Sequence, residues 1–410
     1  MFSCLTKLFN STKLLLQQGN KTFMERKRKT TIVDGVAYRL LYAKNNSSQN
    51  IITAKINNFL NTTTNRSSFV DRDNQINVSF YEKIYTTISN LVSKQIVNNY
   101  TKQIIAVDGT HSNFNSVLGK EGFALNTNKL SCTPLISGIY NVTYNYPVTL
   151  DLVKHHDERK AFMDFVKNYD SIKNSIFVFD RGYYGNEFVY QLNAKNIDFI
   201  CRIKKNSSLL VVDGVRTNDY KTILNINGIN INIRIITYII NDKNYYIATN
   251  LFNENDYNIN KIKQLYFDRW SIEEYFKFMK THLNLSKMPE KNINGIHKTI
   301  LANLIVSKLI YFISYMIEKK NNKLKVNKTV LTEGFYSEFI LKFIYGKGFG
   351  RRFMTKFFKT FVKLHSHKEN RHYKRKCNTP YLKWYVRQHL KRNTKITTVI
   401  DEPEDIRANG

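Results

Sequence analysis

The order of apolar and polar residues divides the chain into stretches with helical periodicity and stretches typical of strands. Residues 1–100 have a polar, helical pattern, which is clearest in "VSFYEKIYTTISNLVSKQIVNNY". Short apolar runs at residues 104–107 and 175–179 each end at an Asp, which predicts two buried strands. Helices are predicted in "DERKAFMDFVKNY" and after "DRGYYG", and a further strand is predicted in "DFICRIKK".

The pattern changes at residues 207–252, which are typical of β-structure almost throughout. Isoleucines alternate with polar residues around an Asn227-Gly228 pair, which favours a hairpin turn. We therefore expect a β-rich insertion, followed by helices to the end of the chain. The sequence as a whole predicts an α/β protein with a mixed sheet flanked by helices and with helical terminal regions.

Charge identifies a class of partner. The formal net charge is +31 and the pI is near 9.8, which predicts attraction to a polyanion, with nucleic acid favoured over a membrane surface. Residues 341–400 hold 17 Lys and Arg and one acid, Glu369, so this segment either binds phosphates or is a solvated basic extension. We expect no membrane partner, because Asn303 and Lys308 interrupt the most apolar run, which favours a buried core helix.

Cysteines and histidines add little. The four cysteines lie far apart in a long chain, which implies no disulfide framework and fits a reducing compartment. A cluster near the end has a spacing that fits no standard zinc finger, so we favour phosphate-facing histidines over a metal site. The histidines between the two predicted strands at residues 104–107 and 175–179 are interpreted as surface residues or as residues that lie behind a site without contacting its ligand. The cluster is His365, His367, His372 and Cys377, and the other histidines are His111, His155 and His156.

One helical stretch, "YFDRWSIEEYFKFMKTHLNL", combines an apolar stripe with a charged stripe. In a single helix, the seven-residue spacing would place Tyr266, Glu273 and Lys280 on one face, with Arg269 one turn before the Glu. The adjacent apolar stripe predicts packing against a core. Taken alone, the pattern also fits an ordinary amphipathic helix with an Arg269–Glu273 ion pair. The apolar stripe consists of Ile272, Phe276, Met279 and Leu283.

Acidic residues at the predicted strand ends indicate chemistry. Asp108 and Asp180 each end a strand, and strand ends are where open α/β sheets place their sites. With Glu273 on a later helix, three carboxylates could hold divalent cations for an in-line phosphoryl displacement. Each acid also has a simpler interpretation, since Asp-Gly favours a turn and Asp180 could cap the following helix.

The chain resembles the DDE transposases of the insertion-sequence-four type. Their signature of Tyr, two residues, Arg, three residues, Glu, six residues and Lys is met by Tyr266, Arg269, Glu273 and Lys280. "IIAVDGT" and "IFVFDRGYYG" look like the two Asp segments of that family. The resemblance covers roughly residues 100–290.

The resemblance implies an RNase H-like core in which Asp108, Asp180 and Glu273 bind Mg²⁺ or Mn²⁺, with two ions in each active site. It also implies that Tyr266, Arg269 and Lys280 contact DNA phosphates near the cleaved end. The expected partners are double-stranded DNA, as terminal inverted repeats and target DNA, and a second copy of the chain on paired ends.

These expectations divide the chain into five segments. Residues 1–100 form a helical DNA-binding or dimerisation region, 101–206 and 253–320 form the two parts of the catalytic core around the insertion at 207–252, and 321–410 form the basic helical end. We expect an intracellular protein that is found with its DNA, in the cytoplasm or nucleoid of a prokaryote, or in a nucleus or viral factory, and that is not secreted.

The leading hypothesis from the sequence is a cut-and-paste DNA transposase that cleaves and transfers strands at transposon ends. Two alternatives stay open. A transposase-derived protein could bind DNA without catalysis, because positive charge does not distinguish cutting from holding. A metal-dependent nuclease could cleave without strand transfer.

Overall fold

The structure is a computed structural model, and it describes residues 2–23, 30–96, 102–123, 125, 131–154, 157–169, 172–205, 207–210, 218–226, 228–240, 242–321 and 324–366. His365 lies within these ranges. The other residues of the suggested histidine and cysteine cluster lie outside them, as does the basic end beyond residue 366. Also outside are His155, His156 and Asn227.

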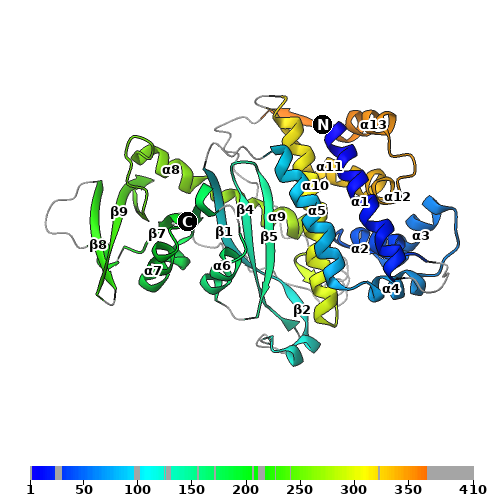
Figure 1. Ribbon diagram of the computed structural model, residues 1–410, viewed down its shortest axis with the longest axis horizontal. Helices are drawn as coiled ribbons and strands as arrows, with labels where there is room; N and C mark the ends of the chain where they lie inside the picture. Colours follow the sequence, from blue (N-terminus) through cyan, green and yellow to red (C-terminus); the bar gives the residue numbers. More distant parts are fainter. Residues whose placement is uncertain are drawn as a thin grey trace, which may run out of the picture. The chain divides into compact units, whose positions relative to one another are not determined.

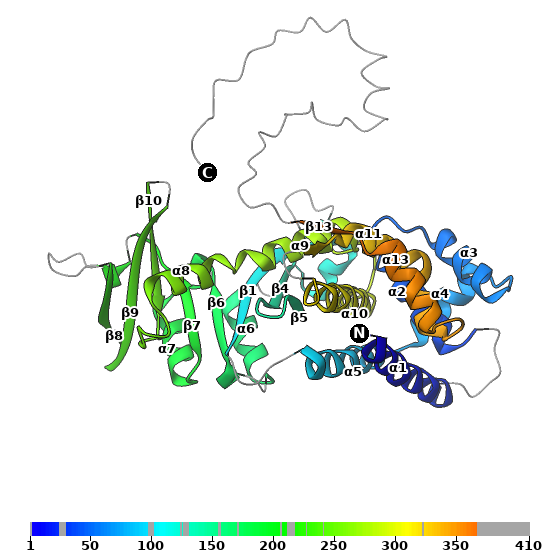
Figure 2. The same ribbon diagram turned by 90° about the horizontal axis from the view of Figure 1, so that it is seen from above.

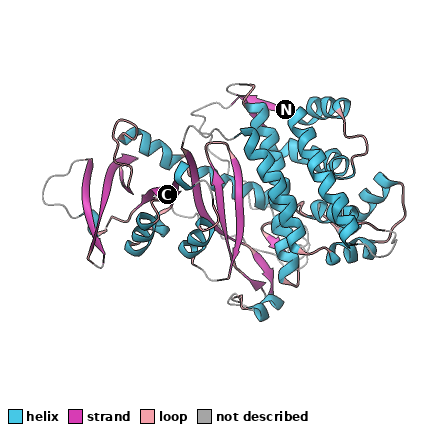
Figure 3. Ribbon diagram, in the orientation of Figure 1, coloured by secondary structure: helices cyan, strands magenta, loops and turns pink. Residues whose placement is uncertain are grey.

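A mixed eight-stranded sheet forms the centre of the fold, and Figure 3 shows the helices that flank it. Its order is β5 (Tyr146–Val153), β4 (Leu135–Asn141), β1 (Gln103–His111), β6 (Ser175–Phe179), β7 (Asp198–Arg202), β10 (Lys243–Thr249), β9 (Ile229–Ile240) and β8 (Asp219–Ile226) (Figure 1). The neighbours β1, β6 and β7 run parallel, and all other pairs are antiparallel. The predicted mixed sheet flanked by helices is confirmed.

Helices cover both faces of the parallel strands, which explains why these strands are continuous apolar runs. On β6, Phe177 and Phe179 pack against α6 (Glu158–Val166) and α7 (Asn186–Ala194). The alternate residues Ile176 and Val178 face the opposite side and pack with α8 (Ile259–Phe267). Figure 2 shows that α8 is followed directly by α9 (Trp270–His282), which packs on β1 and β4.

The predicted β-rich insertion extends the central sheet. Strand β10 pairs with β7, and β9 and β8 follow outward to the edge. Ile231, Ile233 and Ile235 of β9 are buried in the core that β6 and α7 also share. Without the insertion, β7 would be an edge strand with unpaired N–H and C=O groups. Pairing with β10 gives these backbone groups their hydrogen-bond partners. Gly228, the second residue of the expected turn, has φ +80°, a conformation that glycine adopts at no steric cost.

The most apolar run forms α10 (Ile293–Glu318), the one helix among the described residues that is long and apolar enough to cross a membrane. In its most apolar 18-residue window, 83% is buried within the protein. It contacts β5, α5 (Val78–Ile96) and α2 (Ile32–Tyr42). The prediction of a core helix is confirmed.

The terminal helices share one apolar core with α9 and α10. Residues from α1 to α5 and from α11 to α13 belong to this same cluster. Because the core continues across residues 100 and 320, the division of the chain into separate regions at those two positions stays a prediction. The remaining helices are α1 (Phe2–Phe23), α3 (Gln49–Leu60), α4 (Arg66–Gln75), α11 (Lys328–Gly334), α12 (Ile340–Tyr345) and α13 (Arg351–Phe361). Two small sheets complete the fold, formed by β11 (Lys287–Met288), β2 (Asn113–Asn115) and β3 (Ser131–Cys132), and by β12 (Leu324–Val326) and β13 (Leu364–Ser366).

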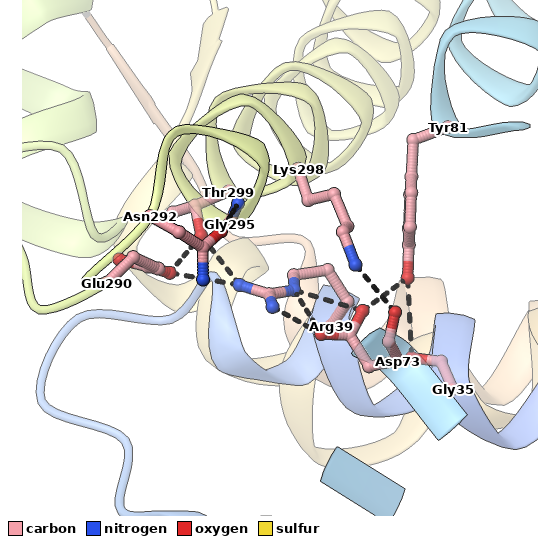
Figure 4. Close-up of polar contacts among 9 residues, drawn as sticks. All are labelled: Gly35, Arg39, Asp73, Tyr81, Glu290, Asn292, Gly295, Lys298 and Thr299. Carbon is pink, nitrogen blue, oxygen red and sulfur yellow. Dashed lines mark hydrogen bonds and ion pairs between the residues drawn. The ribbon is translucent and has the colours of Figure 1, made fainter. Parts of the chain in front are cut away.

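A buried polar network joins the N-terminal helices to α10 (Figure 4). Arg39 of α2 forms ion pairs with Asp73 of α4 and with Glu290, the latter at 2.9 Å. Lys298 of α10 donates to the Asp73 carbonyl at 2.6 Å, and the Tyr81 hydroxyl donates to the Asp73 carboxylate at 2.8 Å. Because these groups are buried, each depends on its partners to replace the hydrogen bonds of water.

Candidate active site

The two predicted Asp residues lie side by side where the pairing between β1 and β6 ends. Strands β1 and β6 are parallel, and their paired residues end with Val107 opposite Phe179. Asp108 and Asp180 are the next residues along the chain, so they are neighbours as predicted, but β1 does not end at Asp108, because its pairing with β4 continues to His111. Asp180 also occupies the N-cap position of the short helix η3 (Arg181–Tyr183), but its side chain makes no capping hydrogen bond.

Glu273 is linked to Asp108 through Arg269. The Arg269 guanidinium donates from Nη1 to Asp108 Oδ2 at 3.3 Å and from Nη2 to Glu273 Oε1 at 2.5 Å. The Arg269 side chain is 5% exposed, against 20% for Asp108 and 35% for Glu273. The Arg269–Glu273 pair is therefore more than a contact on an isolated helix, because it also holds a carboxylate from the central sheet.

The structure corrects the prediction of one helix through residues 266–285. Tyr266 lies in α8, whereas Glu273 lies in α9, and Asp268 and Arg269 form a turn between the two helices. At this turn, the N–H groups of Arg269 and Ile272 donate to carbonyls three residues earlier. Hydrogen bonds of that spacing tighten the backbone locally. Neither glycine nor proline marks the position, so periodicity alone could not locate it. The four residues predicted for the apolar stripe are all buried.

Tyr266 lies beside Arg269, and Lys280 lies farther along α9. The Tyr266 side chain is buried, and the Arg269 guanidinium is 5.9 Å from its ring centroid. Burial raises the pKa of Tyr266 to about 12, so the phenol stays protonated at neutral pH and can donate a hydrogen bond. Lys280 is half-buried, which lowers the pKa of its ammonium, and it forms no ion pair within the described residues.

The site disfavours uncompensated negative charge. Burial raises the pKa of Asp108 to about 6, while Arg269 and the Gly109 N–H oppose that rise. Carboxylate oxygens in such surroundings are suitable ligands for a hard divalent cation. Among the described residues, however, no three His, Cys, Asp or Glu side chains lie close enough together to hold one ion. In this arrangement, the positive charge beside the carboxylates is that of Arg269.

A fourth acid, Glu158, lies near the two Asp residues and was not among the predicted site residues. Glu158 is the first residue of α6. Its charge adds to the effect of burial in raising the pKa of Asp108. Burial also raises the pKa of Glu158 itself, and the charge of Asp180 adds to that effect. An acid in the first turn of a helix is common, so the sequence gives no signal that separates Glu158 from an ordinary helix start.

Arg269 also lines an aromatic and cationic cavity of about 700 Å³. Tyr238 and Tyr245 stack with ring centroids 5.4 Å apart on neighbouring strands. The guanidinium of Arg202 is 4.5 Å from the Tyr245 centroid, and 54% of the Trp270 side chain is exposed at the cavity. Flat rings beside cations can stack bases and hold phosphates. The sequence places the two tyrosines in the β-rich segment, but their shared cavity depends on how β9 and β10 pair.

Comparisons with known proteins identify the family of the chain. The family described as "Transposase DDE domain" matches residues 99–309. A protein of Synechocystis sp., provisionally named as the transposase for insertion sequence element IS4SA, is 29% identical over 147 residues, which are 34% of this chain and 42% of that relative. The chain thus spans about two fifths of the length of that relative.

Among solved structures, the piggyBac transposase synaptic complex with hairpin DNA aligns over 97% of this chain and 86% of its own, with a TM-score of 0.48 and 10% identity. The family match covers more than half of the chain and includes both Asp residues and the helix that bears Glu273. The chain belongs to the transposase family defined by the DDE domain.

Proposed function

We propose that the protein is a DNA transposase that cleaves and joins strands at the ends of a mobile element. The observation that carries this proposal is the link from Asp108 through Arg269 to Glu273, beside Asp180, in a chain of the DDE transposase family. In the proposed reaction, a water oxygen attacks a phosphorus atom, and the bond to the 3′ oxygen breaks to leave a 3′-hydroxyl. That hydroxyl then attacks a phosphorus atom of target DNA, which releases a 3′-hydroxyl of the target.

DDE transposases generally depend on divalent metal, and here Asp108, Asp180 and Glu273 would hold Mg²⁺ or Mn²⁺, with two ions in each site. Bound ions would stabilise the negative charge that develops on the attacking and leaving oxygens. The carboxylates would have to draw closer than they are in this structure. Arg269 would have to release at least one of them, and glutamate side chains have enough rotatable bonds to follow.

The surrounding side chains support contact with DNA. Once released, the Arg269 guanidinium could bind a phosphate, and Tyr266 and Lys280 could donate further hydrogen bonds to the backbone. The aromatic cavity beside Arg269 would hold unpaired bases near the cleaved end. The net charge of +31 supplies attraction to double-stranded DNA of any sequence. We expect two copies to act on paired terminal repeats, at the place where the host keeps its DNA.

One observation favours a second candidate, a DNA-binding protein without catalysis. Arg269 neutralises two of the three carboxylates, and no metal-holding group exists among the described residues. A protein that only holds DNA would keep this arrangement permanently. A nuclease without strand transfer would instead form nicks and no joined products.

The test uses DNA that carries the inverted repeats flanking the gene, with Mg²⁺ and a target plasmid. We expect cleavage at the repeat ends and joined products, and Asp108→Ala should bind the same DNA without cutting it. Joined products from the unaltered protein alone would establish the transposase. Intact DNA with both proteins bound equally would refute catalysis, and nicks without joining would indicate the nuclease.

A further inference from the structure

Lys308 of α10 is a buried cation whose printed neighbours are all uncharged. Its side chain is 2% exposed. Its Nζ atom donates to the carbonyl oxygen of Pro147 at 2.8 Å and to the hydroxyl of Tyr85 at a longer 3.5 Å. The ring centroids of Tyr146 and Tyr85 lie 4.6 and 5.3 Å from the same atom. These groups solvate an ammonium, but none of them neutralises its charge.

Other buried cations of this fold are paired with acids. Arg39 pairs with Asp73, and the fully buried Arg234 pairs with Asp219. Lys308 pairs with no carboxylate among the described residues, and its hydrogen bonds go to a carbonyl and a hydroxyl. A buried charge is costly unless it is paired, so burial lowers the pKa of Lys308 to about 7. The fold therefore supplies a buried amine but not the anion that would match its charged form.

A cavity of about 560 Å³ is open beside Lys308. Residues of α5, β5 and α10 line it, and α10 packs on both of the other elements (Figure 1). Among the described residues, those that line the cavity include no Asp or Glu. Its wall on α5 carries the hydroxyls of Thr86, Ser89 and Ser93 and a second cation, Lys94. A cavity with cations, hydroxyl donors and no acid is complementary to an anion.

This cavity is separate from the candidate active site. Gln103, the first residue of β1, lines the cavity, whereas Asp108 lies five residues farther along that strand. At about 3.3 Å for each residue of a strand, the two positions are roughly 16 Å apart. A small ligand bound beside Lys308 would therefore not touch the carboxylates of the candidate active site.

We infer that this cavity binds a small oxyanion, such as a phosphate or sulfate group, against the ammonium of Lys308. The anion supplies the missing negative charge, and the hydroxyls of α5 donate to its other oxygens. A volume within the range of small-molecule sites also allows the oxyanion to be one group of a larger ligand. Because α5 belongs to the N-terminal helices and β5 to the central sheet, the bound anion would link these two parts of the fold. The inference goes beyond the proposed function and does not depend on it.

The test measures sulfate binding to the full chain by calorimetry, in a phosphate-free buffer without DNA or metal. Lys308→Met keeps the length of the side chain and removes its charge. It should weaken sulfate binding by about 10-fold or more, because it removes a charge-assisted hydrogen bond. Lys83→Met is the matched control, since Lys83 is an exposed cation of α5 that does not line the cavity. This control should bind sulfate as the unaltered protein does.

The pH dependence of sulfate binding is a second test, and it needs no substitution at Lys308. Sulfate keeps both of its charges between pH 8 and 9, whereas the ammonium of Lys308 is lost as the pH rises above its pKa of about 7. The affinity should therefore fall by about tenfold over this pH unit. Burial raises the pKa of Tyr85 and raises that of Tyr146 to about 12, so both phenols stay neutral. Asp151 of β5, whose charge reaches Tyr85, has a pKa of about 6 and is already ionised. The other titratable residues of the lining are Lys94 and Tyr169, and the same fall in affinity should appear in Lys94→Gln and in Tyr169→Phe.

Equal sulfate binding by Lys308→Met and the unaltered protein would overturn the inference. An affinity of the unaltered protein that stays constant between pH 8 and 9, or the absence of saturable binding, would overturn it as well. Adenosine monophosphate serves as a second probe of the same site. If it binds more tightly than sulfate and needs Lys308, the oxyanion is one group of a larger ligand, whereas binding no tighter than that of sulfate indicates the free ion, and either result supports the site. Cleavage of DNA ends is measured separately, so the proposed function is judged on its own test.

Discussion

Replacing Arg269 should make the DNA-free protein bind metal more tightly. Arg269 now supplies the positive charge between Asp108 and Glu273, so a cation must compete with its guanidinium for both carboxylates. Arg269→Gln removes that competitor and keeps a polar side chain of similar reach. The same change removes a predicted contact with a DNA phosphate, so it should lower the rate of end cleavage. Opposite effects on metal binding and on cleavage are the signature of this arrangement.

The two hydrogen bonds set the size of the effect. A charge-assisted hydrogen bond contributes about 1.5–3 kcal/mol when it is protected from water, and an exposed ion pair contributes less than about 1 kcal/mol. Because Asp108 is 20% exposed and Glu273 is 35% exposed, we take about 1 kcal/mol for each bond, a value between these two ranges. Their sum of about 2 kcal/mol corresponds to roughly 30-fold tighter metal binding, at about 1.4 kcal/mol for each factor of ten.

The assay is calorimetric titration of the full chain with Mn²⁺, with no DNA present. Lys280→Gln is the control, because it removes a cation of α9, the helix that bears Glu273, and Lys280 makes no ion pair within the described residues. It should leave Mn²⁺ affinity unchanged. If the Arg269→Gln variant binds Mn²⁺ no more tightly than the unaltered protein, the view that Arg269 occupies the place of the cation is refuted.

Three further predictions concern stability and DNA binding. Arg39→Met leaves Asp73 buried without its cation and should lower the free energy of unfolding in urea by about 3–5 kcal/mol. Lys44→Met, at an exposed ion pair, should lower it by less than about 1 kcal/mol. Equal losses in the two variants would contradict the importance of the buried network. Arg352 and Lys356 lie on the exposed face of α13. Changing both to Gln should make the plot of log K for DNA binding against log salt concentration less steep, by about 0.9 for each phosphate that the helix no longer neutralises. An unchanged slope would show that this helix does not contact DNA. Burial lowers the pKa of Lys308 from 10.5 to about 7. Between pH 7 and pH 10.5, the unfolded chain therefore holds a proton on Lys308 that the folded chain lacks. The free energy of unfolding should rise by about 1.4 kcal/mol for each pH unit in this range. Lys308→Met should remove that rise, and the same pH profile in both proteins would show that Lys308 is charged when folded.

The elements that the sequence predicted best are those decided by local patterns. The run at residues 175–179 is apolar throughout because both of its faces are buried, and it forms β6 at those same residues. The stripe ending at Leu283 is buried because a helix with that spacing can pack only one face. The adjacency of Asp108 and Asp180 followed from two such runs that pair in parallel, although β1 continues past Asp108 to His111.

Other features depend on long-range contacts that no local pattern records. The turn at Asp268 and Arg269 keeps backbone angles close to those of a helix, so it leaves no gap in the periodicity. The insertion joins the central sheet because β10 pairs with the edge of β7, and pairing partners cannot be read from alternation alone. Glu158 lies beside Gly109 only because α6 packs back onto β1, far earlier in the chain.

The position of α10 has a consequence for how such a gene can be shortened. The family-matched segment ends within this helix, and helices encoded before and after that segment cover its apolar surface. A fragment holding only the matched segment would expose that surface to water and would tend to aggregate. Copies of the gene that lose either end during genome decay should therefore yield insoluble products, and they would not act as dominant inhibitors that compete for the element's ends.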